Sequence, residues 1–405
     1  MATSSSRQKL PAWLASAIGS KKHIAKGVHI LAQRESTRVY ARTRRGQYDD
    51  EDEPGDPAAE HYSTGVGMHH LHLHKNRYMD ILPYDRTRVI VNHESDKYDA
   101  YTIEGRYLNA NWVLERFGHK WWIAAQAPLK HTAHAFMSLI LQPFVHPPHS
   151  SSTTRTSQIR TVVQLTRNVE LGRKKADVYF PSEIGQSLIL SPEEGCRAPP
   201  LKATLLQKRA IERAHCIHST VSITPLQQTF SSNTTIDNQG DIVAPNSEPV
   251  IFEHLLYLSW PDHGVPDLEH RDSLLTFINL VDSINRDKSH CSLHPGSTSD
   301  HPCTELDPDP PVIIGCSAGI GRTGSFIAIS SLLRKYGCLP TASNPSMPSA
   351  IHPSPLGPLP NDFKDDLVLL EIDSLREQRP GMVQKNEQAL LIYEVLVDSF
   401  TAPSS

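Results

Sequence analysis

The chain has 405 residues and a formal net charge of −4 at pH 7, and only 38% of its residues are hydrophobic. With 31 prolines, this composition predicts one sizeable core with long insertions rather than several packed domains. A pI near 6.6 argues against a nucleic-acid-binding protein, and no apolar run is long enough to span a membrane. Six cysteines are too few for a disulfide scaffold. We therefore expect a reduced, intracellular protein of the cytoplasm, with the nucleus as a second compartment.

The first 34 residues carry six Lys or Arg and no acidic residue. Mitochondrial presequences begin in this way, but only two of the six charges are Arg, which weighs against import. The alternative is a surface helix whose apolar contacts are Trp13, Leu14, Ile18 and Ile24. Residues 49–57 combine an acidic run with two prolines and predict a solvated loop. We assign residues 1–69 to an N-terminal helix and a polar extension.

Residue patterning predicts the remaining elements in chain order. Between residues 75 and 144, aromatic and branched residues concentrate at 88–92, 107–114 and 121–125. Strands are predicted at 158–165, 176–180, 251–258 and 312–314, and helices at 267–284, 322–336, 361–376 and 386–400. Insertions are predicted near 145–157, 186–248, 287–311 and 338–361. Residues 337–361 have seven prolines and no charged side chain, so we expect no helix and no buried core there.

The most informative segment is 312–324, with the sequence VIIGCSAGIGRTG. A short buried strand leads to Cys316, and a tight turn and a helix follow it. The turn consists of Ser317, Ala318, Gly319, Ile320 and Gly321. The N–H groups of such a turn form an anion-binding nest, and the helix N-terminus adds further donors. Arg322 offers a planar fork for two phosphate oxygens. Because a thiol in that field loses its proton below the usual cysteine pKa, the segment predicts a thiolate nucleophile beneath a phosphate cradle.

A cysteine and an arginine at this spacing recur by chance, and Cys316 alone could be a small buried residue at a strand end. The complete string CSAGIGRTG, however, resembles the phosphate-binding loop of the cysteine-dependent protein tyrosine phosphatases. Further segments resemble that family's motifs in the same order: KNRY at 75–78 with PYDRTRV at 83–89, YLNA at 107–110, AQAPL at 125–129, WPDHGVP at 260–266 and QKNEQ at 384–388. The resemblance implies a tyrosine-specific, non-receptor, fungal-like type. It also implies a single α/β domain at 70–400, with a twisted mixed β-sheet flanked by helices and long disordered insertions.

The resemblance implies a two-step mechanism through a covalent cysteinyl-phosphate. Cys316 would attack phosphorus, while Arg322 and the loop amides stabilise the developing charge. Asp262 would protonate the leaving phenolate oxygen and then act as base on the incoming water. Outside the motif, Asp262 could simply cap a turn.

Three further roles follow from the resemblance. Thr323 would hydrogen-bond the departing thiolate in the second step. Gln384 would position the hydrolytic water, and Gln388 would assist it. No cofactor or metal is implied, because Arg322 and the backbone dipoles supply the positive field.

The resemblance also implies how the substrate is chosen. Tyr78 would stack against the phosphotyrosine ring, in a slot too deep for phosphoserine, and Asp80 would accept N–H groups of the substrate backbone. Glu170 resembles the acid that orients Arg322, and Lys175 resembles the lysine that approaches the WPDHGVP segment. Tyr78 could instead be an ordinary half-buried strand aromatic, and Glu170 and Lys175 could be ordinary solvated charges. The implied partners are phosphotyrosine-containing proteins, a kinase activation loop among them.

The sequence departs from the family pattern at three positions. Gly315 stands where a histidine usually precedes the nucleophile and helps to lower its pKa. Ala127 replaces a glycine, and Lys385 replaces a small hydroxyl residue. We expect a weakened but active enzyme. The rival is a weakly active or dead phosphotyrosine-binding pseudophosphatase, which the presence of all the catalytic residues disfavours.

Two further protein classes share part of this pattern. A zinc-binding module would use the histidines and cysteines at His290, Cys291, His294, His301 and Cys303. Their spacing fits no regular zinc motif and the segment is rich in proline. A dual-specificity phosphatase would share the chemistry of Cys316 but would lack the KNRY segment and the QKNEQ segment.

Overall fold

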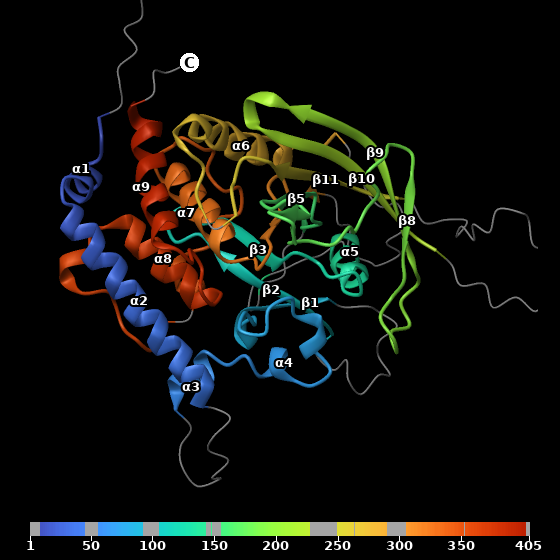
Figure 1. Ribbon diagram of the computed structural model, residues 1–405, viewed down its shortest axis with the longest axis horizontal. Coiled ribbons are helices and arrows are strands. Elements are labelled where there is room, and N and C mark those ends of the chain that lie inside the picture. Colours follow the sequence, from blue (N-terminus) through green and yellow to red (C-terminus); the bar gives the residue numbers. More distant parts are fainter. Residues whose placement is uncertain are drawn as a thin grey trace, which may run out of the picture.

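The computed structural model describes residues 9–44, 56–91, 105–142, 147, 155–226, 249–262, 264–289, 305–351 and 353–401. Its centre is a nine-stranded sheet in the order β1-β2-β3-β13-β5-β11-β10-β9-β8 (Figure 1). The strands are β1 (Arg88–Val91), β2 (Arg106–Leu114), β3 (Trp121–Gln126), β5 (Thr161–Gln164), β8 (Ser187–Leu190), β9 (Leu201–Ile211), β10 (Cys216–Pro225), β11 (Val250–Tyr257) and β13 (Val312–Cys316). Two small sheets pair β4 (Arg155–Thr156) with β12 (Glu305–Leu306), and β6 (Val169–Glu170) with β7 (Arg173–Lys174).

The direction of the strands changes across the large sheet. The central strands β3, β13, β5 and β11 are parallel to one another. Antiparallel strands continue the sheet on both sides, with β2 and β1 beyond β3, and β10, β9 and β8 beyond β11. The predicted mixed β-sheet is therefore confirmed.

Helices cover both faces of this sheet (Figure 1). They are α1 (Ala12–Ile18), α2 (Lys21–Arg44), α3 (Pro57–His61), α4 (Gly65–Met68), α5 (Ala133–Leu141), α6 (Leu268–Arg286), α7 (Gly321–Lys335), α8 (Leu367–Gln378) and α9 (Asn386–Thr401). One buried cluster packs α6, α7, α8 and α9 on one face of the sheet. Another packs α5 on the opposite face. None of the described helices is long and apolar enough to cross a membrane.

Two of the predicted helices begin at aspartate caps. The side chain of Asp267 accepts a hydrogen bond from the N–H of His270 at 3.1 Å and begins α6. Asp366 does the same for Leu369 at 3.1 Å and begins α8. Such caps satisfy N–H groups that a helix start leaves without a partner. The four helices predicted from residue 267 onward are all present; three differ from prediction by one or two residues at their ends, whereas the helix predicted at 361–376 begins only at Leu367.

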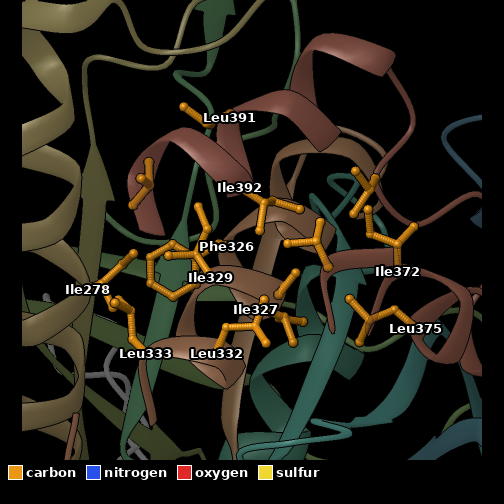
Figure 2. Close-up of a cluster of buried hydrophobic side chains, with 14 of the residues drawn as sticks. Ile278, Phe326, Ile327, Ile329, Leu332, Leu333, Ile372, Leu375, Leu391 and Ile392 are labelled. Atoms are coloured by element: carbon orange, nitrogen blue, oxygen red, sulfur yellow. The ribbon is translucent and has the colours of Figure 1, made fainter. Parts of the chain in front are cut away.

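Helix α7, which follows the phosphate loop, is enclosed by apolar side chains (Figure 2). Phe326, Ile327 and Ile329 of α7 pack with residues of α6, α8 and α9 in the same buried cluster. Close packing on all sides leaves a helix little freedom to shift. The first turn of α7 is therefore a rigid base for the loop before it.

The N-terminal segment folds as helices on this same body. Leu14 and Ile24 are buried and Trp13 is partly buried against the main core, whereas Ile18 is exposed. Along α2, the buried Arg38 lies 2.6 Å from carboxylate oxygens of both Asp373 and Glu377 on α8. The surface-helix interpretation is thus confirmed, except for Ile18.

Several loop and strand predictions need correction. The insertion predicted at 186–248 is wrong for residues 187–225, which form β8, β9 and β10 of the large sheet. The strand predicted at 176–180 is wrong, because Tyr179 and Phe180 pack on the α5 side of the sheet without pairing. Most of 145–157 and 287–311, together with 227–248, lies outside the described residues.

Residues 337–361 also differ from expectation. They contain no α-helix, as predicted, but Leu339 and Leu359 are buried in the main core. Ser346 accepts a hydrogen bond from Trp121 Nε1 at 2.8 Å, and Ser354 donates one to Glu377 at 2.9 Å. The segment buries apolar side chains without periodicity, so the prediction of no buried core was wrong.

Candidate active site

The nucleophile candidate lies where β13 ends. Along this strand Val312, Ile314 and Cys316 point to the helix-covered face that carries α7, and Ile313 points to the opposite face. This alternation follows from the two-residue repeat of a strand. Cys316 is only 6% exposed, so the surrounding protein covers most of its thiol.

The loop after Cys316 is pressed against the end of β3. Gly319 has φ +70°, and a Cβ there would lie 2.1 Å from the Ala125 carbonyl oxygen. Only glycine permits both the positive φ and this close approach to β3. The N–H of Ala127 also donates to the Ser317 carbonyl at 3.1 Å. Strand β3 therefore sets the shape of the loop.

The thiol of Cys316 is set up to ionise. Burial alone would raise its pKa, but the Thr323 hydroxyl, the charge of Arg322, and the N–H groups of Ile320 and Thr323 lower the pKa below the usual cysteine value. Thr323 is fully buried, and its hydroxyl has no oxygen or nitrogen partner within the described part of the chain. The predicted role of this hydroxyl in stabilising the departing thiolate stays a prediction.

Arg322 is held as a rigid fork at the first turn of α7. Its Nη1 and Nη2 donate to the two carboxylate oxygens of Glu170 at 2.8 and 2.7 Å, and Nη1 also donates to the Leu165 carbonyl at 2.8 Å. Burial alone would raise the pKa of Glu170, but the hydrogen bonds and charge of Arg322 lower it below its usual value. The bidentate pair fixes the plane of the guanidinium.

Asp262 lies beside this fork. One carboxylate oxygen is 3.4 Å from Arg322 Nη2, and the other is 2.7 Å from Lys175 Nζ. The loop that carries Asp262 is anchored by Trp260, which is 3% exposed and donates from Nε1 to the Gly264 carbonyl at 3.2 Å. The structure thus brings Asp262, Lys175, Glu170 and Arg322 together.

Tyr78 flanks the opening of the loop. Its hydroxyl lies 2.8 Å from Ser317 Oγ, which itself donates to the Lys175 carbonyl at 2.7 Å, so Tyr78 donates to Ser317. The half-buried Tyr78 ring is therefore beside the site where a substrate ring would enter. Asp80 is exposed and makes no hydrogen bond to the loop among the described residues.

The two predicted glutamines differ in position. Gln388 is buried, and its side-chain amide lies 2.9 Å from the place a Cβ on Gly321 would take, so it packs directly on the loop. Its Oε1 also accepts from the N–H of Lys385 at 3.0 Å. Gln384 is exposed, lines a hollow between α2 and α9, and makes no hydrogen bond to the loop within the described ranges.

The sequence analysis missed Arg379, which is fully buried. Its guanidinium donates to the carbonyls of Gly319 at 2.8 Å and Ala318 at 3.0 Å, and to the side chains of Asn111 and Asn109 at 2.8 and 2.9 Å. Arg379 thus ties the Ala318 and Gly319 part of the loop to two asparagines of β2. An arginine in the run RPGMVQ, just before Gln384, was the available signal.

Arg77 and Gln126, also missed, fix the segment that carries Tyr78. Gln126 Oε1 accepts from the Arg77 N–H and Nε2 donates to the Lys75 carbonyl, each at 2.8 Å. Arg77 donates to the Ala127 and Pro128 carbonyls at 3.1 and 2.8 Å. The end of β3 thus holds both the recognition segment and the phosphate loop.

The predicted departures from the family pattern have local explanations. A Cβ on Gly315 would lie 2.6 Å from the Ala125 carbonyl oxygen, closer than real Cβ contacts. Ala127 is buried at the contact with Ser317, and Lys385 is exposed. Position 315 has no space for a histidine unless β3 moves.

Metal-binding geometry is not found in the part of the chain that the structure describes, where no three His, Cys, Asp or Glu residues converge. The histidines and cysteines considered for zinc, within 290–303, lie outside the described residues. The four described cysteines are free thiols: Cys196, Cys216, Cys316 and Cys338.

Known proteins are similar to this chain in sequence and in fold. Residues 72–348 match the model of a family described as protein-tyrosine phosphatase. The chain belongs to the protein-tyrosine phosphatase family. Among solved structures, the catalytic domain of human protein tyrosine phosphatase non-receptor type 18 superposes with a TM-score of 0.56, at 22% identity, over 93% of this chain and 99% of that one. The phosphatase fold expected from the sequence is confirmed.

Curated relatives are similar at a low level of identity. A tyrosine-protein phosphatase Lar-like protein of Caenorhabditis elegans is 26% identical over 85% of this chain and 11% of its own length. The mouse tyrosine-protein phosphatase non-receptor type 18 is 26% identical over 84% of this chain and 54% of its own length. The chain thus spans about a tenth to about half of these phosphatases.

Proposed function

We propose that this chain hydrolyses phosphotyrosine in proteins through a cysteinyl-phosphate intermediate. The observation that carries the proposal is the set of charges around Cys316. Arg322 is fixed by Glu170 beside the thiol, and Asp262 is held next to Arg322 by Lys175. This set provides a nucleophile, an anion clamp and a proton donor within one buried opening.

In the first step the Cys316 thiolate attacks phosphorus and forms an S–P bond. The P–O bond to the tyrosine breaks, and Asp262 gives its proton to the leaving phenolate oxygen. Arg322 and the loop N–H groups bind the equatorial oxygens, where negative charge is concentrated. Arg379 supports this step by tying the Ala318 and Gly319 part of the loop to β2.

In the second step water attacks phosphorus and gives its proton to Asp262, so the S–P bond breaks and inorganic phosphate leaves. The thiolate departs as an anion, which the Thr323 hydroxyl and Arg322 stabilise. Gln384 and Gln388 are proposed to orient the water. Gln388 already packs on the loop, whereas Gln384 must turn inward from its exposed position to take part.

Depth supports a preference for phosphotyrosine. Cys316 is 6% exposed and Tyr78 contacts the phosphate loop at Ser317, which supports a site that favours the longer phosphotyrosine side chain over phosphoserine. Asp80, exposed beside Tyr78, is proposed to accept N–H groups of the substrate backbone. The non-receptor type 18 phosphatase has been solved in complex with HER2 phosphopeptides, which supports phosphotyrosine proteins as the partner class.

The protein is proposed to act in signal transduction in a reducing compartment such as the cytoplasm. A catalytic thiol needs such surroundings, and the described cysteines are free. A kinase activation loop is one phosphotyrosine segment that would suit an enzyme of this kind. The mechanism uses no cofactor.

The test is turnover of matched phosphotyrosine and phosphoserine peptides by the purified protein, with and without vanadate. Release of phosphate from the phosphotyrosine peptide alone, inhibited by vanadate, is the expected result. Binding of the phosphotyrosine peptide without phosphate release would instead identify a pseudophosphatase and contradict the proposal.

A further inference from the structure

The residue paired with Gly315 on the neighbouring strand is a glutamine whose side-chain amide uses its full hydrogen-bonding capacity. Gly315 of β13 is paired in register with Gln164 of β5. Gln164 is 7% exposed, and its Nε2 donates to the Thr166 carbonyl at 2.6 Å and to Asn168 Oδ1 at 3.1 Å. Its Oε1 accepts two further bonds, so all four hydrogen-bonding positions of the amide are used.

The two donors to Gln164 Oε1 are Tyr179 Oη at 3.1 Å and His254 Nε2 at 3.2 Å, both buried. Burial, with a contribution from His218, lowers the pKa of His254 to about 3, and burial raises the pKa of Tyr179 above its usual value. Both groups therefore keep their donor proton and stay neutral over the working pH range. A fully satisfied buried network of this kind is rigid.

This network lies directly behind the nucleophile. A cavity of about 20 Å³ is lined by Gln164, Tyr179, Gly315 and Cys316 together with apolar neighbours. Gly315 adds no side chain to this lining, so Gln164, Tyr179 and Gln126 are the residues that bring hydrogen-bonding side chains to it beside Cys316.

The same glutamine shapes the loop that holds Arg322. The Leu165 carbonyl accepts from Arg322 at 2.8 Å, and the Leu165 N–H donates to the Gly315 carbonyl at 2.8 Å. Thr166, whose carbonyl Gln164 binds, donates from its hydroxyl to Glu170 at 3.0 Å. Gln164 thus connects to both acceptors that fix the guanidinium.

We propose that Gln164 is a positioning residue for the phosphatase reaction. It ties residues 165–170 to the buried Tyr179 and His254, and so holds Glu170 and the Leu165 carbonyl where they orient Arg322 against Cys316. It supplies from β5 a polar side chain beside Gly315, which has none of its own. The proposal rests on the proposed function for its catalytic consequence, but its geometric part concerns Arg322 and the thiol alone.

The test compares Gln164→Met, which keeps the volume and removes all four hydrogen bonds, with the milder Tyr179→Phe, which removes one. Gln207→Met, at an exposed glutamine of β9, is the matched control. The first readout is the rate of Cys316 alkylation by iodoacetamide against pH, resolved by peptide mass spectrometry. Loosening Arg322 weakens thiolate stabilisation, so the alkylation midpoint should rise by about 0.5 to 1 pH unit in Gln164→Met and less in Tyr179→Phe.

The second readout is kcat/KM for a phosphotyrosine peptide, expected to fall about 10- to 100-fold in Gln164→Met, as small misplacement of a catalytic group implies. Unchanged alkylation profiles in both variants, whether or not their melting temperature falls, would overturn the proposal and leave Gln164 a structural residue. If the wild-type protein hydrolyses no phosphotyrosine, the proposed function fails, while the alkylation profiles still decide the role of Gln164.

Discussion

The ammonium group of Lys175 lies 2.7 Å from the carboxylate of Asp262, and the two side chains are about one tenth exposed. The pair joins the loop after β7 to the loop between β11 and α6. Because Arg322 lies on the other side of the carboxylate at 3.4 Å, Asp262 is held directly over the phosphate loop. A general acid must first lie within reach of the oxygen that it protonates, and only then does its pKa decide how well it works.

Replacing Asp262 tests this placement. Asp262→Ala should lower the turnover rate at saturating phosphotyrosine peptide by about 10² to 10⁴, as the loss of a general acid implies, while peptide capture persists because the loop is untouched. Asp267→Ala, at the exposed cap of α6, is the control and should keep full activity. A wild-type rate in Asp262→Ala would remove Asp262 from the mechanism.

Gly315 cannot gain a side chain without movement of the sheet. A Cβ there would lie 2.6 Å from the Ala125 carbonyl oxygen, so we expect Gly315→Ala to destabilise the protein by about 1 to 3 kcal/mol. Gly315→His should be at least as harmful, although histidine is the usual residue of the family. Gly65→Ala, whose nearest contact would be 3.5 Å, is the control. A Gly315→His variant that is stable and more active than wild type would contradict this prediction, because it would show that β3 moves at little cost to make room for the side chain.

The segment 337–361 should matter for stability. Leu359 is 7% exposed and packs in the main core, so Leu359→Ala should cost about 2 to 5 kcal/mol of the free energy of unfolding, as for other buried leucines. Replacing the whole segment by a Gly-Ser linker should cost more. Denaturant unfolding measures both, and an unchanged midpoint for the linker variant would contradict this packing.

The ion pairs between α2 and α8 should make stability depend on acid pH. Burial alone would raise the pKa of Glu377, but hydrogen bonds from His61 and the charge of Arg38 lower it to about 2. A carboxyl whose pKa is lowered in the folded state stabilises it above the unfolded value, near 4.3, and loses that contribution as pH falls toward 2.

Arg38→Met should therefore be less stable than wild type by about 3 to 5 kcal/mol at neutral pH, because the buried Glu377 keeps its hydrogen bonds from His61 and Ser354 but loses its arginine partner. The difference should shrink between pH 4.5 and 2. Thermal unfolding of both proteins across that range is the measurement. A difference independent of pH would mean that packing of the arginine stem, rather than its charge, stabilises α2.

The catalytic loop was predictable because its chemistry is contiguous: Cys316, the turn and Arg322 lie within seven positions. Glu170 and Lys175 could be placed only through resemblance, and the structure brings both to the site. Arg379 was not predictable from spacing, because its contacts to Gly319 and Asn109 join segments 60 and 270 residues apart.

The wrong predictions of the fold have related causes. Strand β10 has buried serines and threonines on both faces, so its polar composition hid its place inside the sheet between β11 and β9. Residues 337–361 have the proline content of a disordered loop, yet the buried side chains of Leu339 and Leu359 pack this segment on the main core. Composition reports average tendencies, whereas burial is decided by partners distant in sequence.

The central claim is that Cys316 carries the phosphoryl group between tyrosine and water. The most direct measurement is rapid acid quench of the enzyme during turnover of a phosphotyrosine peptide, followed by mass spectrometry of the intact protein and its peptides. We predict a transient adduct of one phosphoryl group on Cys316, which accumulates further in Thr323→Val and is absent in Cys316→Ser. Phosphate release without this adduct, or turnover by Cys316→Ser near the wild-type rate, would contradict the account.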